Sequence, residues 1–235
     1  MTDHRVIDEQ ALAGREHLDP GYVARYDRKA GLDPGSDIDL LRAHGLGPAS
    51  TVIDFGAGTG IFAIAAASVC RLVTAVDASP AMVDALTEKA RHVGATNVEC
   101  VQAGFLTYTH DGPPVDVVYT RNALHHLPDL WKAIALKRMA DMLVPGAILR
   151  LRDLVFSFEL SEAEAGIDEW LHRAASPRPD EGWTRQELEA HLRDEHSTFT
   201  WLLEPMIERA GFAIAEATYG ASGADAAYLC VRRAP

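Results

Sequence analysis

Three glycines at alternate positions mark the stretch where this chain is best equipped for chemistry. Gly56, Gly58 and Gly60 follow residues 51–54, which predict the end of a buried strand, and precede residues 61–69, an alanine-rich run that predicts a buried helix. A glycine turn between strand and helix lets the backbone approach a ligand closely, because no Cβ intervenes. The helix N-terminus adds unpaired N–H groups at the same place. The pattern therefore predicts a site for a small polar ligand.

Polar residues also stand at the ends of other predicted strands. Alternating strands and helices predict a mostly parallel sheet covered on both faces, and ligands of such sheets bind past the carboxyl ends of the strands. The strands are expected at residues 72–77, 97–103, 115–120 and 147–154, with helices at 81–93 and 130–143 between them. The rule selects residues 54–60, Asp77, 103–105, 120–122 and Asp153.

Composition and charge narrow the class of partner. The net charge is −12, from 22 basic and 34 acidic side chains, which argues against nucleic acid or an anionic membrane as the main partner. The three cysteines lack metal-ligand spacing, and we expect no metal site. The first five residues do not resemble a signal peptide, and no apolar run is long enough for a membrane span. A cytoplasmic protein is expected.

The spacing of the glycines distinguishes two kinds of nucleotide site. A dinucleotide fingerprint needs a glycine at its sixth position, where this chain has Ile61. The observed spacing, preceded by Asp54, resembles motif I of the class I S-adenosylmethionine-dependent methyltransferases (E/D-x-G-x-G-x-G). Three later stretches resemble further motifs of that family in order: residues 76–82, residues 116–127 with their Leu-His-His, and residues 143–147 with a Pro-Gly turn. Four ordered motifs are far more specific than one.

The resemblance covers residues 50–155 and, more loosely, the last two strands. It implies an α/β, Rossmann-like fold: a seven-stranded, mostly parallel sheet with helices on both faces and a terminal antiparallel hairpin. It implies S-adenosyl-L-methionine as the cofactor. Asp77 would hold both ribose hydroxyls, since a carboxylate accepts strong charge-assisted hydrogen bonds, and Met82 would line the adenine pocket. Asp54 would fix the glycine turn or meet the ligand's ammonium group.

One departure from the family concerns adenine. The family commonly ends its third strand in Gly-Asp, and that acid accepts a hydrogen bond from the adenine amino group. The matching residues here are Ala103 and Gly104, followed by Phe105, so the side-chain contact is missing. Backbone groups and the Phe105 ring are the expected replacements. The full set of expected cofactor contacts is Tyr26, Asp54, Gly56, Ala57, Gly58, Thr59, Gly60, Asp77, Ala78, Met82, Ala103, Gly104, Phe105, Arg121 and Asn122.

The chain divides into four expected segments. Residues 1–48 form an N-terminal helical cap, whose beginning is poorly ordered or a short helix. Residues 49–156 form the cofactor-binding Rossmann-like core. Residues 157–201, which are crowded with charges, form a helical insertion that serves as a lid on the substrate side. Residues 202–235 supply the last helix and the C-terminal β-hairpin that completes the core.

The catalytic candidates each keep two interpretations. His125 and His126 are candidates for a general base toward a hydroxyl or amine, or they pack in the loop that leads into the next helix. Asp153 either faces the transferred methyl group or is a solvated strand end. A further set, Glu195, His196 and Trp201, either contacts substrate or forms a polar helix face with its aromatics packed inward.

The expected activity is methyl transfer from S-adenosylmethionine to a small-molecule acceptor, by a monomer or homodimer. Because the sulfonium is already activated, positioning and exclusion of water can supply much of the rate, and no recognisable base is required. Two alternatives remain open: a non-catalytic protein that binds S-adenosylmethionine or S-adenosylhomocysteine, and an NAD-dependent oxidoreductase. The sequence does not distinguish O-, N- and C-methylation.

Overall fold

The computed structural model describes residues 6–14 and 16–234. Residues 1–5 and 15 of the expected cap and residue 235 of the expected hairpin segment lie outside the described residues. Within them, no helix combines the length and apolar character needed to cross a bilayer.

Among the described residues, seven strands form one sheet in the order β3-β2-β1-β4-β5-β9-β8. Strands β1 to β5 are parallel to one another, and β9 pairs antiparallel with both β5 and β8 at one edge of the sheet. This arrangement confirms the predicted fold. The order reverses between β1 and β4, so their carboxyl ends open a crevice there. The bounds are β1 Thr51–Phe55, β2 Leu72–Asp77, β3 Val98–Gln102, β4 Val115–Arg121, β5 Leu143–Asp153, β8 Phe212–Tyr219 and β9 Ala226–Arg232.

Helices bury both faces of this sheet. On one face α6 (Asp129–Met142) and α9 (Thr200–Arg209) pack through residues such as Leu136 and Ile207. On the other face α3 (Gly35–Ala43) and α4 (Ile61–Ala67) pack through residues such as Leu41 and Phe62, joined by Leu86 of α5 (Pro80–Val93). These apolar faces place the core on either side of the sheet and leave its carboxyl edge for a ligand.

Two short elements escaped the sequence analysis. Strands β6 (Val155–Phe156) and β7 (Thr198–Phe199) pair in parallel and join the two ends of the insertion. Two residues are too short to show any periodicity. Strand β5 also begins at Leu143, four residues before the predicted start, because Leu143 pairs with Val115 of β4 ahead of an irregularity in the ladder.

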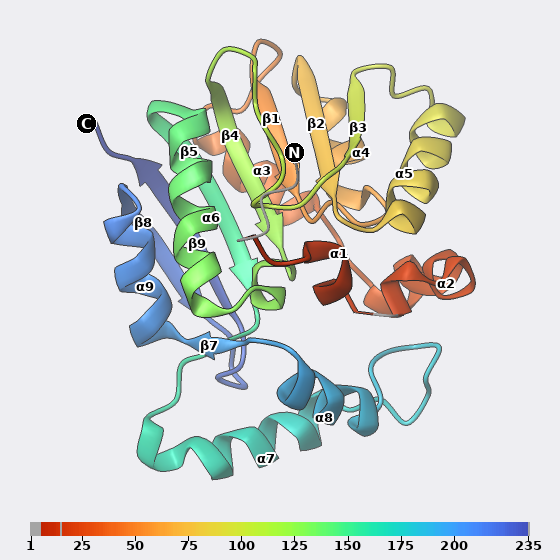
Figure 1. Cartoon of the computed structure of the whole chain (residues 1–235), viewed down its shortest axis with the longest axis vertical. Helices are drawn as coiled ribbons and strands as arrows, with labels where there is room; N and C mark the ends of the chain where they lie inside the picture. The colour runs from red at the N-terminus through yellow and green to blue at the C-terminus, as the bar shows by residue number, and fades with distance from the viewer. Residues whose placement is uncertain (1–5, 15, 235) are drawn as a thin grey trace.

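Two groups of short helices lie beyond the carboxyl edge of the sheet (Figure 1). The first contains α1 (Glu9–Leu12), η1 (Glu16–Leu18) and α2 (Pro20–Ala30). The second is the insertion, with η3 (Leu160–Glu162), α7 (Ala163–Ala174) and α8 (Arg185–Asp194). The insertion has a small apolar cluster of its own, in which Trp170, Leu171 and Leu188 pack with Phe156 and Ala224. Burial of this cluster positions the insertion against the core.

Candidate active site

In the turn after β1, the three glycines differ in what a side chain at each position would contact. A Cβ on Gly56, whose φ is +67°, would lie 2.2 Å from the Cβ of Ala123, so only glycine lets the β4 loop approach this closely. A Cβ on Gly60 would lie 2.7 Å from Leu86, so this glycine permits α4 and α5 to pack. Gly58 has a φ of +55°, and its nearest neighbour is the Tyr26 ring at 3.9 Å. Gly58 therefore leaves its backbone facing open space, whereas a side chain at Gly56 or Gly60 would collide with a neighbouring residue.

Two adjoining cavities, as far as the described residues define them, lie on either side of this turn. With the space open to solvent included, they hold about 650 Å³ and about 450 Å³. Tyr26, Gly56, Gly58 and Arg121 line both. The larger cavity is also lined by the predicted residues Asp77, Ala78, Met82, Ala103, Gly104, Phe105 and Asn122, and the smaller one by Asp54, Ala57 and Thr59.

The structure thus brings together the predicted cofactor contacts, with Gly60 as the exception. Gly60 is not among the residues that the structure describes as lining either cavity, and its packing against Leu86 accounts for it. Asn122 at the end of β4 adopts a φ of +50°, an uncommon conformation for a non-glycine residue. Such strain clusters at functional sites, which fits its place in the cavity lining.

Two acids of the crevice differ in what they bind. Asp77 accepts hydrogen bonds of 2.8 Å from the backbone N–H groups of Gly58 and Ser79. Burial raises its pKa, and these two N–H groups oppose the rise. Burial, reinforced by the charge of Asp77, raises the pKa of Asp54 well above its usual value. Asp77 is therefore the better placed of the two to accept from a ligand as a carboxylate.

Glu9 of α1 occupies the place of the missing adenine acid. A Cβ built on Gly104 would lie 2.2 Å from the Glu9 carboxyl carbon, so the carboxyl group fills the space that a side chain at position 104 would take. Its oxygens accept hydrogen bonds of 3.1 Å from the N–H groups of Leu106 and Thr107, and one of 3.0 Å from the Thr107 hydroxyl. Glu9 is buried, lines the larger cavity, and has a pKa raised by that burial against the lowering effect of these bonds.

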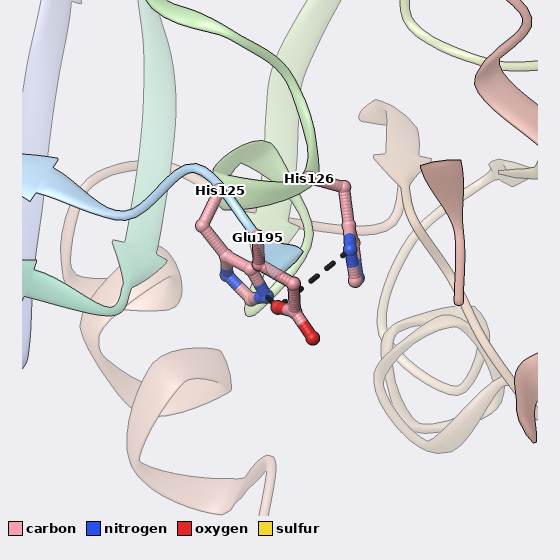
Figure 2. A group of neighbouring side chains, drawn as sticks. All are labelled: His125, His126 and Glu195. Atoms are coloured by element: carbon pink, nitrogen blue, oxygen red, sulfur yellow. Dashed lines mark ion pairs between the residues drawn. The ribbon is translucent and has the colours of Figure 1, made fainter. Parts of the chain in front are cut away.

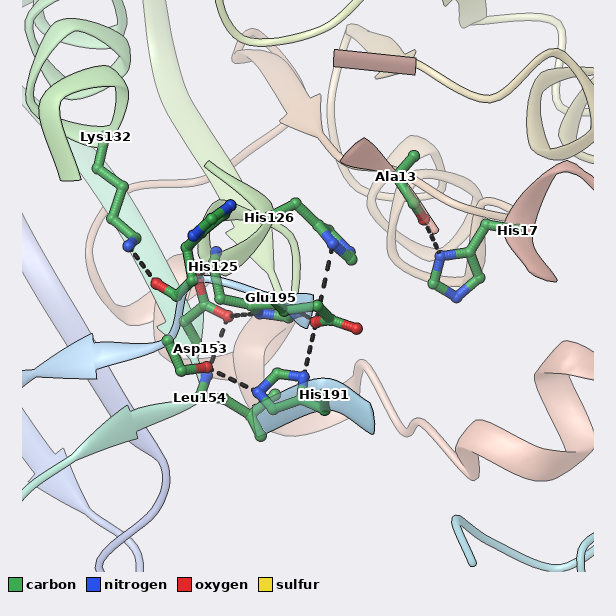
Figure 3. A network of polar contacts seen from close by, with 11 residues as sticks. Ala13, His17, His125, His126, Lys132, Asp153, Leu154, His191 and Glu195 are labelled. Carbon is green, nitrogen blue, oxygen red and sulfur yellow. Dashed lines mark hydrogen bonds and ion pairs between the residues drawn. The ribbon is translucent and has the colours of Figure 1, made fainter. Parts of the chain in front are cut away.

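The catalytic candidates lie in two layers. His126 lines the larger cavity, whereas His125 and Asp153 are buried behind it and pair with each other. Glu195, in the connection between α8 and β7, lies against both histidines, with its Oε2 2.9 Å from His125 Nε2 and 3.8 Å from His126 Nδ1 (Figure 2). A fourth side chain, His191 of α8, places its Nδ1 2.6 Å from the same oxygen (Figure 3).

Neighbouring charges give the two adjacent histidines opposite pKa shifts. Burial alone lowers the pKa of His125, but Asp153 and Glu195 outweigh it and raise the value to about 9. Burial and the charge of His125 hold the pKa of His126 well below its usual value. Burial would raise the pKa of Glu195, but its contacts with His125 and His191 lower it instead. The free structure therefore carries a charged His125 and Glu195 beside a neutral His126.

The other predicted substrate contacts lie farther out. The His196 backbone N–H donates to the His125 carbonyl over 2.9 Å, so the chain here is tied to the Leu-His-His loop by its backbone. Trp201 at the start of α9 is 54% exposed and stacks on Phe199. Glu195 follows the end of α8 rather than lying on a helix face.

Some crevice residues gave no signal in the sequence. Glu9, Ala13 and His17 line the larger cavity from the N-terminal segment. The His17 ring lies 5.8 Å from the His126 ring and 5.6 Å from the Tyr26 ring. These residues belong to a polar stretch with no motif, so nothing short of the folded chain places them at the site. Ala123 and Leu127, inside the Leu-His-His motif, complete the lining.

Comparison with known proteins identifies the family. Residues 52–146 match the family described as a methyltransferase domain. These residues therefore form a class I S-adenosylmethionine-dependent methyltransferase domain within the chain. Its cofactor is S-adenosylmethionine. The NAD-dependent and non-catalytic alternatives therefore lose their support. A comparison with curated proteins gives no match.

Solved structures share the methyltransferase's fold at low identity. Magnesium protoporphyrin IX methyltransferase from Synechocystis PCC 6803, with bound S-adenosylmethionine, aligns at a TM-score of 0.67 and 17% identity, over 98% of this chain and 100% of that one. A SAM-dependent methyltransferase from Aquifex aeolicus aligns at a TM-score of 0.59 and 21% identity, over 91% of this chain and 98% of that one. The [4+2]-cyclase SpnF aligns at a TM-score of 0.64 and 14% identity, over 84% of this chain and 80% of that one.

Proposed function

We propose that this methyltransferase acts on a small molecule enclosed between the N-terminal cap and the insertion. The observation that carries the proposal is the contact between these two segments over the crevice. Lys29 of α2 lies 2.5 Å from Glu187 of α8 and 4.6 Å from the centre of the Trp183 ring, and the Tyr26 ring lies 6.4 Å from that of Trp183. A roof of this kind leaves room for a small acceptor and excludes a macromolecular surface.

The crevice fits the cofactor. Its two cavities meet at the bare backbone of Gly56 and Gly58, which suits a long ligand bound across the turn. When bound, S-adenosylmethionine supplies a methyl group already activated on a sulfonium. We assign the larger cavity to the adenosine part, with Asp77 accepting from the ribose hydroxyls, and the smaller cavity to the amino-acid part.

Glu9 would hold the adenine amino group in this arrangement. Its carboxyl group lies in the position left open by Gly104 and lines the larger cavity. The bonds from Leu106 and Thr107 fix its orientation, and a carboxylate has about four lone-pair sites, so acceptor capacity remains. The chain thereby supplies from α1 the acid that the family commonly carries at the end of the third strand.

The contribution of the remaining residues is to position the acceptor and exclude water. The His17, Tyr26 and His126 rings line the larger cavity, and the contact between Tyr26 and Trp183 would limit access of solvent to it. Orientation of two reactants in such an enclosure can lower a barrier by several kcal/mol, about 7–11 in the best model systems. Of the catalytic candidates, His126 borders this space, and His125 and Asp153 support it from behind.

A transfer assay with labelled methyl groups tests the acceptor class. Small hydroxyl- and amine-bearing metabolites are expected to accept label, whereas tRNA and denatured protein are not. Trp183→Ala should raise the KM for the acceptor about tenfold, consistent with the loss of one aromatic contact, and leave S-adenosylhomocysteine affinity within about twofold. Trp201→Ala, in an exposed ring outside the roof, is the matched control. Label transferred to a macromolecule and to none of the small molecules would refute the proposal.

A further inference from the structure

Three potential metal ligands converge where the Leu-His-His loop meets the insertion. One potential ligand atom each from His125, His126 and Glu195 lies within 4.8 Å of the other two, and Figure 2 shows the Glu195 carboxylate beside both imidazole rings. Two of them are adjacent in the sequence, and the third is contributed by the end of α8. No other group of this kind occurs within residues 6–14 and 16–234.

Two of the three ligand atoms lack a hydrogen-bond partner. Among the described residues, His126 Nδ1 and Glu195 Oε2 are buried and receive no hydrogen bond of acceptable geometry, although ring nitrogens of His125 and His191 lie 2.9 and 2.6 Å from the carboxylate oxygen. A buried polar atom left in this state is destabilising, because no hydrogen bond compensates for its loss of hydration. A cation bound between them would satisfy both atoms at once.

The third ligand is oriented as metal-binding histidines are. His125 Nδ1 pairs with Asp153, which leaves Nε2 directed at Glu195. Asp153 is itself fixed by hydrogen bonds from the N–H groups of His125 and Leu154, at 2.8 and 2.9 Å. A carboxylate behind a histidine ring is the usual outer partner of a metal ligand, because it fixes the tautomer and the ring orientation. Figure 3 shows the His191 ring beside the Glu195 carboxylate, with its Nδ1 2.6 Å from Oε2.

We propose that His125, His126 and Glu195 bind one divalent transition-metal ion of the Zn²⁺ class. Two imidazole nitrogens and one carboxylate oxygen form the ligand set of many catalytic zinc sites and of non-haem iron sites, and they do not suit Mg²⁺. Ligand atoms around tetrahedral zinc lie about 3.3 Å apart, as follows from bonds of about 2.0–2.1 Å. The observed separations of 2.9 and 3.8 Å lie on either side of this value.

The ion would have two consequences. Its three protein ligands leave at least one position open, and because His126 lines the larger cavity, that position borders the crevice. An acceptor oxygen could bind there and lose its proton more readily. This role rests on the proposed small-molecule acceptor, whereas metal binding itself does not. The ion would also tie the insertion to the core through Glu195.

Titration of the full chain, freed of any histidine tag and stripped of metal with a chelator, tests the site. Calorimetry with Zn²⁺ and visible absorption with Co²⁺ should each show one equivalent bound, and Mg²⁺ should give no heat. Asp153→Asn should weaken Zn²⁺ binding about 10- to 100-fold, and Glu195→Gln should weaken it further. Glu189→Gln and His92→Asn remove an exposed carboxylate and an exposed imidazole elsewhere, and should leave binding unchanged.

S-adenosylhomocysteine affinity, measured on the same samples, shows that each variant is folded. Failure of the metal-stripped wild type to bind Zn²⁺ or Co²⁺, or equal binding by Glu195→Gln and Glu189→Gln, would overturn the metal site. Either result with S-adenosylhomocysteine binding intact would leave the methyl-transfer proposal standing. Normal metal binding without transfer to any small molecule would instead reject the acceptor class alone.

Discussion

The two carboxylates of the larger cavity reach it by opposite routes. Asp77 ends strand β2, and its bonds to Gly58 and Ser79 follow from the strand-turn-helix geometry of the surrounding chain. Glu9 comes from the N-terminal cap and bonds residues 97 and 98 positions away. The core therefore builds its part of the site from local spacing, whereas the cap and the insertion bring theirs through long-range contacts. A motif search detects the first kind of residue and misses the second.

Removal of the anchor between cap and core is the strongest test of this contrast. Asp37 of α3 is buried, bonds Arg150 at 2.9 Å and Arg152 at 3.0 Å, and accepts from the Tyr119 hydroxyl. Asp37→Asn should lower the free energy of unfolding by about 3–5 kcal/mol, because it leaves buried guanidinium groups unpaired. Denaturant titration measures the loss. A loss below about 1 kcal/mol would show that the cap is not anchored there.

The same variant has a pH signature. Burial alone would raise the pKa of Asp37, but Arg150 and Arg152 outweigh it and lower the pKa. A lowered pKa stabilises the fold above the unfolded-state value of about 3.9, and this stability is lost as the pH falls through the lower folded-state value. The difference between wild type and Asp37→Asn should therefore be full at neutral pH and shrink below about pH 4. Asp39→Asn, exposed on the same helix, should show neither effect.

Substitution of the locally positioned carboxylate should have the next largest effect. Asp77→Asn keeps the shape of the side chain but removes its charge and one acceptor oxygen. S-adenosylhomocysteine should bind about 30- to 100-fold more weakly, equivalent to roughly 2–3 kcal/mol for charge-assisted bonds to the ribose. Calorimetry measures this, with Asp84→Asn on exposed α5 surface as the control. Unchanged affinity would remove the ribose assignment.

Substitution of Glu9, the carboxylate that the cap contributes, should reduce cofactor affinity less than substitution of Asp77 and should change ligand specificity more. Glu9→Gln should weaken S-adenosylhomocysteine binding about tenfold, the worth of one hydrogen bond to a charged acceptor. S-inosylhomocysteine carries an oxygen in place of the adenine amino group, so wild type should bind it poorly, and the variant should discriminate less between the two ligands. If the variant keeps the full preference for adenine, Glu9 does not contact the amino group and the contrast with Asp77 fails.

The contact between cap and insertion should give the smallest effect. Lys29 is largely buried in its pair with Glu187, which is 41% exposed. Lys29→Met should cost no more than about 1 kcal/mol of stability, as is usual for a partly exposed pair. A rise in acceptor KM that exceeds the loss of stability would show that the roof matters for substrate. Lys137→Met, which breaks an exposed pair with Asp141 on α6, should change neither quantity.

The sequence by itself determined the elements whose residue types follow a fixed local spacing. The apolar runs located the strands of the parallel sheet, and Ser79 and Pro80 do begin α5, with Ser79 accepting from Met82. The glycine turn was found because close backbone approach restricts the residue type. The short strands β6 and β7 were not found, because two residues carry no period and their pairing is decided by the ends of the insertion.

Only the tertiary structure decided how the remote segments complete the site. Gly104 by itself implied a missing contact, and folding showed that the space above it belongs to Glu9. His125 and His126 were ambiguous as a dipeptide, because adjacent side chains point in different directions. Asp153 and Glu195, 28 and 70 residues from His125, give that residue its partners and leave His126 at the crevice. Contacts over such separations depend on the packing of whole elements, which no local spacing encodes.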